Sequence, residues 1–136
     1  MEETHVVTCF LERDSDKKIA LLRRSQMVGT YKGRWAGVSG YIEKENTPLQ
    51  QAFEEIREEV GLNEDDIRLL MEGEPLIVID EKLGKRWIVH SFRFRLTRPK
   101  KIEIDWEHTE LKWINPEEMK IYETVPQLYE TWERVK

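Results

Sequence analysis

The stretch from Gly40 to Leu62 constrains this chain more than any other part of its sequence. It enters a predicted helix whose second half carries Glu55, Glu58 and Glu59 on one face, because positions i, i+3 and i+4 of a helix span an arc of about 100°. Like charges at this spacing repel, and they stand near the helix end that disfavours anions. A helix that breaks two local rules at one place is a candidate functional site. The simplest relief is a hard divalent cation with oxygen ligands, such as Mg²⁺.

The helix is predicted over residues 48–60, where Asn46 or Thr47 can cap its start and a glycine follows its end. Its apolar residues form one stripe, the predicted core-facing side: Leu49, Ala52, Phe53, Ile56 and Val60. The carboxylate arc lies beside this stripe. We therefore expect Glu55 and Glu59 at the edge of the buried face, where the exclusion of water strengthens the attraction of a bound cation.

Length and charge restrict the class of protein. The 136 residues suit a single domain over 1–136, and a net charge of −5 disfavours nucleic acid and anionic membranes as partners. No apolar run approaches the roughly 20 residues of a membrane span, and the acidic N-terminus does not resemble a secretory signal. The single cysteine, Cys9, excludes an internal disulfide and is expected to be buried. These features predict a cytoplasmic protein.

Short strands and turns surround the predicted helix. Strands are predicted at residues 5–12, 19–22, 35–42, 69–71, 75–80, 86–96 and 110–114. In the longest of these the even-numbered positions are predicted to face the core, with His90 as a hydrogen-bonded core residue rather than a ligand. A terminal helix is predicted from about Pro126 to Val135, capped by Thr124. This order predicts an α/β (α+β) fold, an α/β/α sandwich with a central mixed β-sheet.

The stretch from position 40 to 62 resembles the sequence box of the Nudix hydrolase family. That box is a glycine, five residues, Glu, seven residues, then Arg-Glu-aliphatic-x-Glu-Glu-x-Gly-aliphatic, and the positions that match it here are Gly40, Glu55, Ile56, Glu58, Glu59, Gly61 and Leu62. The flanks at 21–25, 33–40 and 106–119 also resemble the family. A run of glutamates alone is a weak signal, whereas the full spacing with both glycines in register is a strong one.

Two positions depart from the box. Asn46 replaces its early Glu, and Glu54 replaces its Arg. In the family these two residues often form an ion pair that braces the loop against the helix, so their joint replacement indicates that this pair is lost. Arg57 could pair with Glu54 instead, and Lys44 or Glu45 could brace the loop.

The resemblance implies metal-dependent hydrolysis, with Mg²⁺ or Mn²⁺, of a pyrophosphate bond in a nucleoside diphosphate linked to another moiety. The substrate would be a small molecule: a nucleotide, a nucleotide sugar or a dinucleotide. Metal ions would stand between the carboxylates and the substrate's phosphates. The implied catalytic residues and metal ligands are Glu55, Glu58 and Glu59, with Glu55 as ligand or general base. Further implied ligands are the carbonyl of Gly40 and either Glu107 or Glu110, with His108 as a weaker candidate.

Arginines and aromatic residues outside the box are candidate substrate contacts. Phosphate oxygens could be bound by Arg23, Arg24, Arg93 or Arg95. A base could stack on Tyr31, Trp35 or Trp87. The alternative function is a Nudix-fold nucleotide-binding or regulatory module with weak or no catalysis, in which the two departures mark its decay. A homodimer, paired through the N-terminal hairpin or the Trp-bearing strands, is left open.

Overall fold

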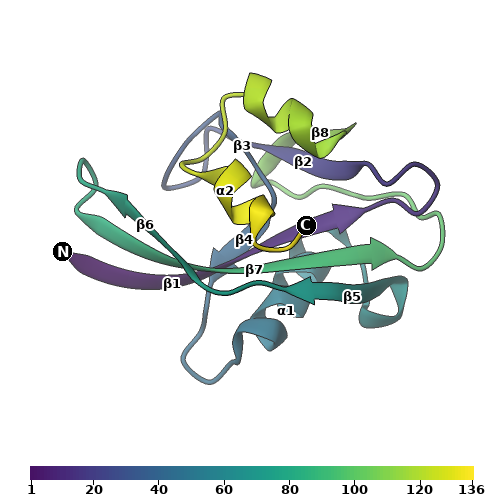
Figure 1. The fold of residues 1–136 in the computed structure, drawn as a ribbon, viewed down its shortest axis with the longest axis horizontal. Helices are drawn as coiled ribbons and strands as arrows, with labels where there is room; N and C mark the ends of the chain where they lie inside the picture. The colour runs from purple at the N-terminus through teal and green to yellow at the C-terminus, as the bar shows by residue number, and fades with distance from the viewer.

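Eight strands and two α-helices make up the computed structural model, which describes residues 1–136 (Figure 1). The strands are β1 (Glu2–Glu12), β2 (Ile19–Arg24), β3 (Trp35–Ala36), β4 (Val38–Tyr41), β5 (Ile67–Glu72), β6 (Leu76–Asp80), β7 (Lys85–Leu96) and β8 (His108–Ile114). The helical segments are α1 (Pro48–Val60), η1 (Glu64–Asp66), η2 (Pro116–Ile121) and α2 (Leu128–Glu133).

β1 and β7 form the parallel centre of the sheet. They stay in register from the Glu2–Lys85 pair to the Glu12–Arg95 pair. β4 and β2 pair with the other edge of β1, and β6 and β5 pair with the other edge of β7, all of them antiparallel. β2 also pairs with β3 and β8. A parallel pair within an otherwise antiparallel sheet confirms the predicted mixed sheet.

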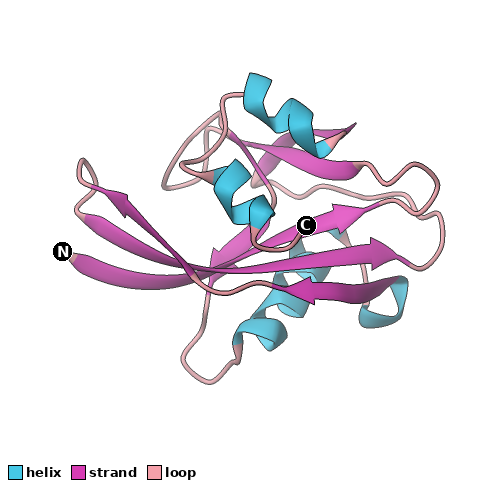
Figure 2. Ribbon diagram, viewed as in Figure 1, coloured by secondary structure: helices cyan, strands magenta, loops and turns pink.

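Helices cover both faces of this sheet, as Figure 2 shows. Under α1 the buried core includes Val7, Cys9, Leu11, Ala52, Ile56, Phe92 and Phe94. Under α2 a second core includes Phe10, Ile19, Leu21, Trp35, Met119, Leu128 and Trp132. The predicted α+β sandwich and the burial of Cys9 are therefore confirmed. Neither helix has the length and apolar character that a membrane crossing requires.

The ends of α1 are fixed by its own sequence. Thr47, not Asn46, caps the helix: its Oγ1 accepts the backbone N–H of Gln50 at 3.1 Å, and the Gln50 side chain accepts the backbone N–H of Thr47 at 2.8 Å. Gly61 ends the helix in the left-handed conformation, with φ of 72°. The predicted helix over 48–60 is confirmed, with the carboxylates in its last two turns.

One sequence prediction about β7 needs correction. The even positions Ile88, Phe92, Phe94 and Leu96 are buried as predicted, and the odd positions Trp87, Val89 and Ser91 are buried as well. His90 is half-exposed rather than a core residue, although it is hydrogen-bonded, with its Nε2 3.0 Å from Nδ1 of His5.

The terminal helix is shorter than predicted. α2 begins at Leu128, and Thr124 does not cap it. The backbone of Trp35 donates to the carbonyl of Glu123 at 2.8 Å and accepts from the N–H of Val125 at 2.9 Å, so this segment is held extended beside β3. An extended backbone cannot also form the first helical turn.

Candidate active site

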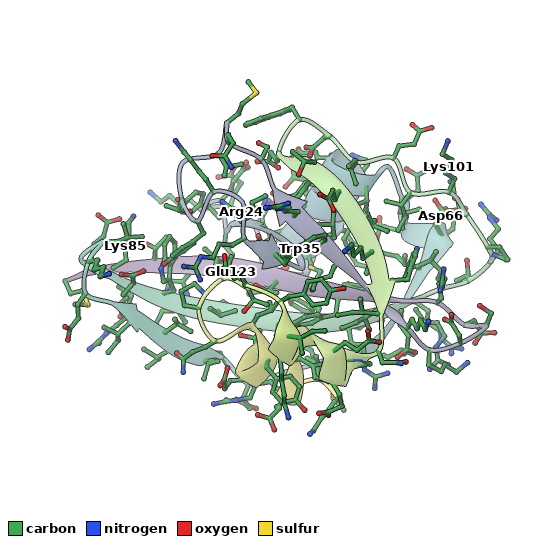
Figure 3. All side chains as sticks on the ribbon, turned by 90° about the horizontal axis from the view of Figure 1, so that it is seen from above. Arg24, Trp35, Asp66, Lys85, Lys101 and Glu123 are labelled. Carbon is green, nitrogen blue, oxygen red and sulfur yellow. The ribbon has the colours of Figure 1, made fainter.

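A cavity of about 310 Å³ lies on the α2 side of the sheet. Its wall combines apolar side chains of three strands, Val6, Val78 and Val89, with the charged groups Arg24, Glu55 and Glu107. Figure 3 shows Arg24 in the middle of the molecule, well away from both Lys85 at one end and Asp66 at the other. An apolar cavity of this size with a few convergent charges is a common form of small-molecule site.

Three carboxylates gather beside this cavity. Glu59 of α1 has a side chain only 2% exposed, and its Oε2 has no hydrogen-bond partner. Glu55 lies one turn earlier and is half-buried, and Glu107 comes from the segment before β8. Burial raises the pKa of all three carboxyls. Repulsion by Glu107 and Glu55 raises the pKa of Glu59 further, and repulsion by Asp105 and Glu55 raises that of Glu107. Glu58 is exposed, and its charge adds to the rise in the pKa of Glu55 and Glu107.

Gly40 is packed directly against Glu55. A Cβ at this position would overlap the carboxylate of Glu55, so only a glycine lets the helix carboxylate approach strand β4 this closely. Gly40 and Glu55 both line the cavity. The glycine that opens the box is thus required by its contact with Glu55.

The segment before β8 is anchored on both sides of Glu107. Nδ1 of His108 lies 3.3 Å from the Asp105 carboxylate, and its Nε2 lies 3.6 Å from Oε1 of Glu59. Burial lowers the pKa of His108, although the charge of Asp105 opposes this shift. The carbonyl of Glu107 accepts the backbone N–H of Ser25 at 2.7 Å. These contacts position Glu107 near Glu59, and the sequence alone offered no signal for the part of Asp105.

A model of the NUDIX domain family matches residues 3–134. The chain belongs to this family. This confirms the predicted class, a Nudix-type hydrolase. A search of curated proteins found no match to the chain.

Several solved structures share the Nudix fold of this chain at low sequence identity. The MutT protein from Methanosarcina mazei Go1 is 20% identical, with a TM-score of 0.80 over 97% of this chain and 91% of that one. A C. elegans Ap4A hydrolase in a binary complex is 16% identical, with a TM-score of 0.77 over 98% and 94%. The NUDIX domain of Shewanella oneidensis NrtR, complexed with ADP ribose, is 13% identical, with a TM-score of 0.74 over 98% and 86%. At these identities the likeness establishes the fold.

The two departures from the Nudix box are in contact with each other. Nδ2 of Asn46 donates to Oε2 of Glu54 at 2.7 Å and to Oε1 of Gln51 at 2.8 Å. Gln51 also accepts the backbone N–H of Glu43 at 3.0 Å, and its Nε2 donates to Oε2 of Glu55 at 2.9 Å. The expected ion pair is thus replaced by hydrogen bonds that run from the loop to Glu55. Glu54 bonds to Asn46, so the loop is braced without the other charged candidates.

Gln51 is a site residue that sequence reasoning missed. It is buried on the first turns of α1, one helical turn before Glu55. Its spacing of four residues from Glu55 is the signal that could have found it, because i and i+4 side chains meet on a helix.

Of the four candidate arginines, only Arg24 lines the cavity. Its Nε donates to the carbonyl of Thr30 at 2.9 Å, and its Nη2 lies 3.4 Å from Thr30 Oγ1. Burial lowers the pKa of Arg24, while the charges of Glu59 and Glu107 oppose this shift. Thr30 therefore fixes one edge of the guanidinium, and the group lies next to the carboxylates.

The other three candidate arginines lie outside the cavity. Arg93 and Arg95 both bind the buried Glu12, at 3.3 and 2.6 Å. Arg23 pairs with Glu110 at 3.3 Å. These partners already satisfy the charges, so the three arginines and Glu110 are left out of the site that we propose below.

The aromatic candidates divide in the same way. Trp35 is buried in the core under α2, where its ring packs against Tyr122. Tyr31 and Trp87 line the cavity. The indole N–H of Trp87 donates to the hydroxyl of Tyr31 at 3.0 Å, and that hydroxyl donates to Asp80 at 2.7 Å. These bonds fix both rings in the cavity wall.

The carboxylate group has the chemistry of a site for a hard divalent cation. Its donors are oxygens, and one of them, Oε2 of the buried Glu59, has no other partner. No three acidic, histidine or cysteine side chains are yet gathered closely enough to hold an ion as they stand. Like charges keep these carboxylates apart when no ion is bound. A bound ion would offset this repulsion, and rotamer changes of Glu55 and the exposed Glu58 would then bring them together.

Proposed function

We propose that this Nudix protein hydrolyses the pyrophosphate bond of a nucleoside diphosphate linked to another moiety, with Mg²⁺ or Mn²⁺ as cofactor. The observation that carries the proposal is the convergence of Glu55, Glu59 and Glu107 beside a cavity that also holds Arg24. The names of two similar structures, an Ap4A hydrolase and a domain complexed with ADP ribose, support a nucleotide substrate.

The metal would be held by carboxylates of α1 and its surroundings. Glu55, Glu58 and Glu59 are the proposed ligands, with Glu107 and the carbonyl of Gly40 as further ones. When bound, the ion would polarise a phosphoryl oxygen and lower the pKa of an attacking water. Glu107 is preferred to the other sequence candidate because it lines the cavity and repels Glu55 and Glu59, as metal ligands do before the metal binds.

Residues that the fold holds in place would accept the proton of the attacking water and bind the phosphates. Glu55 would accept the proton of the attacking water, because Gln51 orients its carboxylate and burial raises its pKa towards that of a general base. Arg24, fixed at one edge by Thr30, would donate its free N–H groups to a phosphate oxygen. Trp87 would present an apolar ring to the nucleoside.

The location that we propose is the cytoplasm. Nucleotide substrates and Mg²⁺ would be available there to such an enzyme. The single cysteine is buried and forms no disulfide, which fits a reducing compartment.

The alternative, a binding or regulatory module without catalysis, rested on the two departures from the box. The hydrogen bonds of Asn46 to Glu54 and Gln51 favour the enzyme, because they brace the loop against the helix and keep Glu55 oriented. A site that had lost its catalytic role would not require these hydrogen bonds.

An activity panel with matched variants tests the proposal. Dinucleoside polyphosphates, nucleotide sugars and nucleoside triphosphates would be assayed for pyrophosphate cleavage with Mg²⁺ and with Mn²⁺. Glu58→Gln and Glu107→Gln should each lower kcat by about 100-fold or more. The control, Glu110→Gln, should stay within about threefold, because that side chain is exposed and pairs only with Arg23. Absence of cleavage across the whole panel would refute the enzyme and leave the binding module.

A further inference from the structure

Strand β6 is an edge strand with an apolar, exposed face. It pairs only with β7, so one row of its backbone N–H and C=O groups has no strand partner. Ile77 and Ile79 are 54% and 52% exposed. Figure 1 shows β6 and the start of β7 projecting from the body at the end where the N-terminus lies. This arm is therefore open to another chain.

The neighbouring edge strand shows how such an edge is usually protected. β5 also pairs only with β7, but its register shifts between Leu69 and Met71, and it carries the charged residues Arg68 and Glu72. Bulges and charges are the common devices that prevent strands from pairing edge to edge. β6 has no register shift against β7, and its first four residues are aliphatic. β6 therefore lacks the protection that β5 has.

The exposed isoleucines lie at the margin of the α1 face of the sheet, next to the buried Ile88. Ile77 pairs with Ile88 of β7, which in turn pairs with His5 of β1, so these three lie in one row across the sheet. None of them belongs to the core under α1. The row lies on the α1 face of the sheet but outside the area that α1 covers.

We propose that β6 pairs antiparallel with β6 of a second copy of this chain, about a two-fold axis at Val78. In this register Ile77 lies opposite the partner's Ile79, and Asp80 lies opposite the partner's Leu76, so no like charges meet within the strands. The symmetry makes each contact twice. The two exposed isoleucines of each copy then form cross-strand aliphatic pairs.

The charges that flank β6 fit the same register. Glu74 lies two residues before β6 and Lys82 lies in the turn after it, so the two-fold axis brings Glu74 near the partner's Lys82 at each end of the paired strands. Both side chains are exposed, and neither takes part in an ion pair within the chain. A shift by one residue would break the pairing of Ile77 with the partner's Ile79 and put Ile77 opposite Val78 or Asp80 instead. The register about Val78 pairs the isoleucines and also brings Glu74 near Lys82.

The dimer should be weak. A pairing built on one five-residue strand falls below the roughly 1,200 Å² of a standard interface, so we expect a Kd on the order of micromolar. Sedimentation velocity of the full chain over a range of concentrations should therefore show a monomer–dimer equilibrium. Ile77→Lys should abolish it, whereas Ile121→Lys should not, although Ile121 is even more exposed at 81%.

Charge reversal tests the register. Glu74→Lys and Lys82→Glu should each raise the dimer Kd by about tenfold, because each puts two like-charged pairs into the interface. The two changes together restore opposite charges and should restore the wild-type Kd. Unchanged melting temperatures would show that each variant folds.

Disulfide trapping gives an independent check. In the proposed register Ile77 lies opposite the partner's Ile79, so an equimolar mixture of Ile77→Cys and Ile79→Cys puts two exposed thiols opposite each other, whereas two copies of Ile77→Cys are about 8 Å apart, beyond the reach of a disulfide. Oxidation should cross-link the mixture and not Ile77→Cys alone, since the native Cys9 is buried. A monomer at every concentration, a dimer that survives Ile77→Lys, or equal cross-linking of the mixture and of Ile77→Cys alone would overturn the proposal. A monomer would leave this edge to a strand from a different protein.

Discussion

Replacing Glu59 by Gln should stabilise the metal-free protein and abolish its response to Mg²⁺. Glu59 is buried, its Oε2 has no hydrogen-bond partner, and it faces the carboxylates of Glu55 and Glu107. A Gln side chain has the same shape, carries no charge, and can donate from its amide to Glu55. The substitution therefore removes a cost that the wild-type protein bears only in the absence of the metal.

The structure sets the size of the effect. An unsatisfied buried polar group costs about 1–3 kcal/mol of stability, which is the expected gain from Glu59→Gln in the metal-free protein. For a domain of this length that gain corresponds to a rise in melting temperature of roughly 3–10 °C. Mg²⁺ at about 100 times its Kd should stabilise the wild type by about 2.7 kcal/mol and the variant by much less. The difference in stability between the two proteins should therefore become smaller, or change sign, when Mg²⁺ is added.

Differential scanning calorimetry after treatment with a chelator, and again after addition of Mg²⁺, measures both the metal-free stability and the response to Mg²⁺. Glu58→Gln is the matched control: its side chain is exposed, so it should change metal-free stability by less than about 0.5 kcal/mol while still weakening the Mg²⁺ response. A lower melting temperature for metal-free Glu59→Gln, or a wild-type response of that variant to Mg²⁺, would refute the reasoning.

Three further predictions concern the loop and the cavity wall. Asn46→Asp puts an anion against Glu54, so it should lower the free energy of unfolding by about 1–3 kcal/mol and also lower kcat/KM. Adding Glu54→Arg should recover both quantities. No effect of Asn46→Asp alone would contradict the role of the Asn46–Glu54 hydrogen bond in bracing the loop. Gly40→Ala should lower kcat far more than the melting temperature, because its Cβ displaces a catalytic carboxylate; equal activity would exclude that contact. Burial and the bond to Asp80 raise the pKa of Tyr31 to about 12. The stability that this phenol supplies should be complete below its ordinary pKa of 10.0 and fade as the pH rises towards about 12, and phenolate absorbance should show Tyr31 ionising at a lower pH in Asp80→Asn.

The helix of the Nudix box could be predicted from the sequence with correct ends. Its cap, its glycine stop and its apolar stripe act over one or two turns, so no distant contact was needed to place them. The burial of Glu59 followed from its position beside that stripe.

The arginines and the second acidic residue could not be assigned in this way. Arg23 and Arg24 are adjacent, yet only Arg24 lines the cavity, while Arg23 faces Glu110. The register of β2 against β8 shifts between these two arginines. A bulge of this kind re-aims side chains and depends on both strands, so the sequence of either one does not reveal it.

The sequence by itself determined the fold class, the family resemblance and a face of glutamates on one helix, because helical periodicity and capping are properties of neighbouring residues. The tertiary structure decided which distant groups join that face. It brought Glu107 and Arg24 to the cavity, sent Arg93 and Arg95 to the buried Glu12, and turned two departures from the box into a hydrogen-bonded brace. These outcomes depend on strand pairing and burial between segments far apart in the chain, which no local pattern encodes.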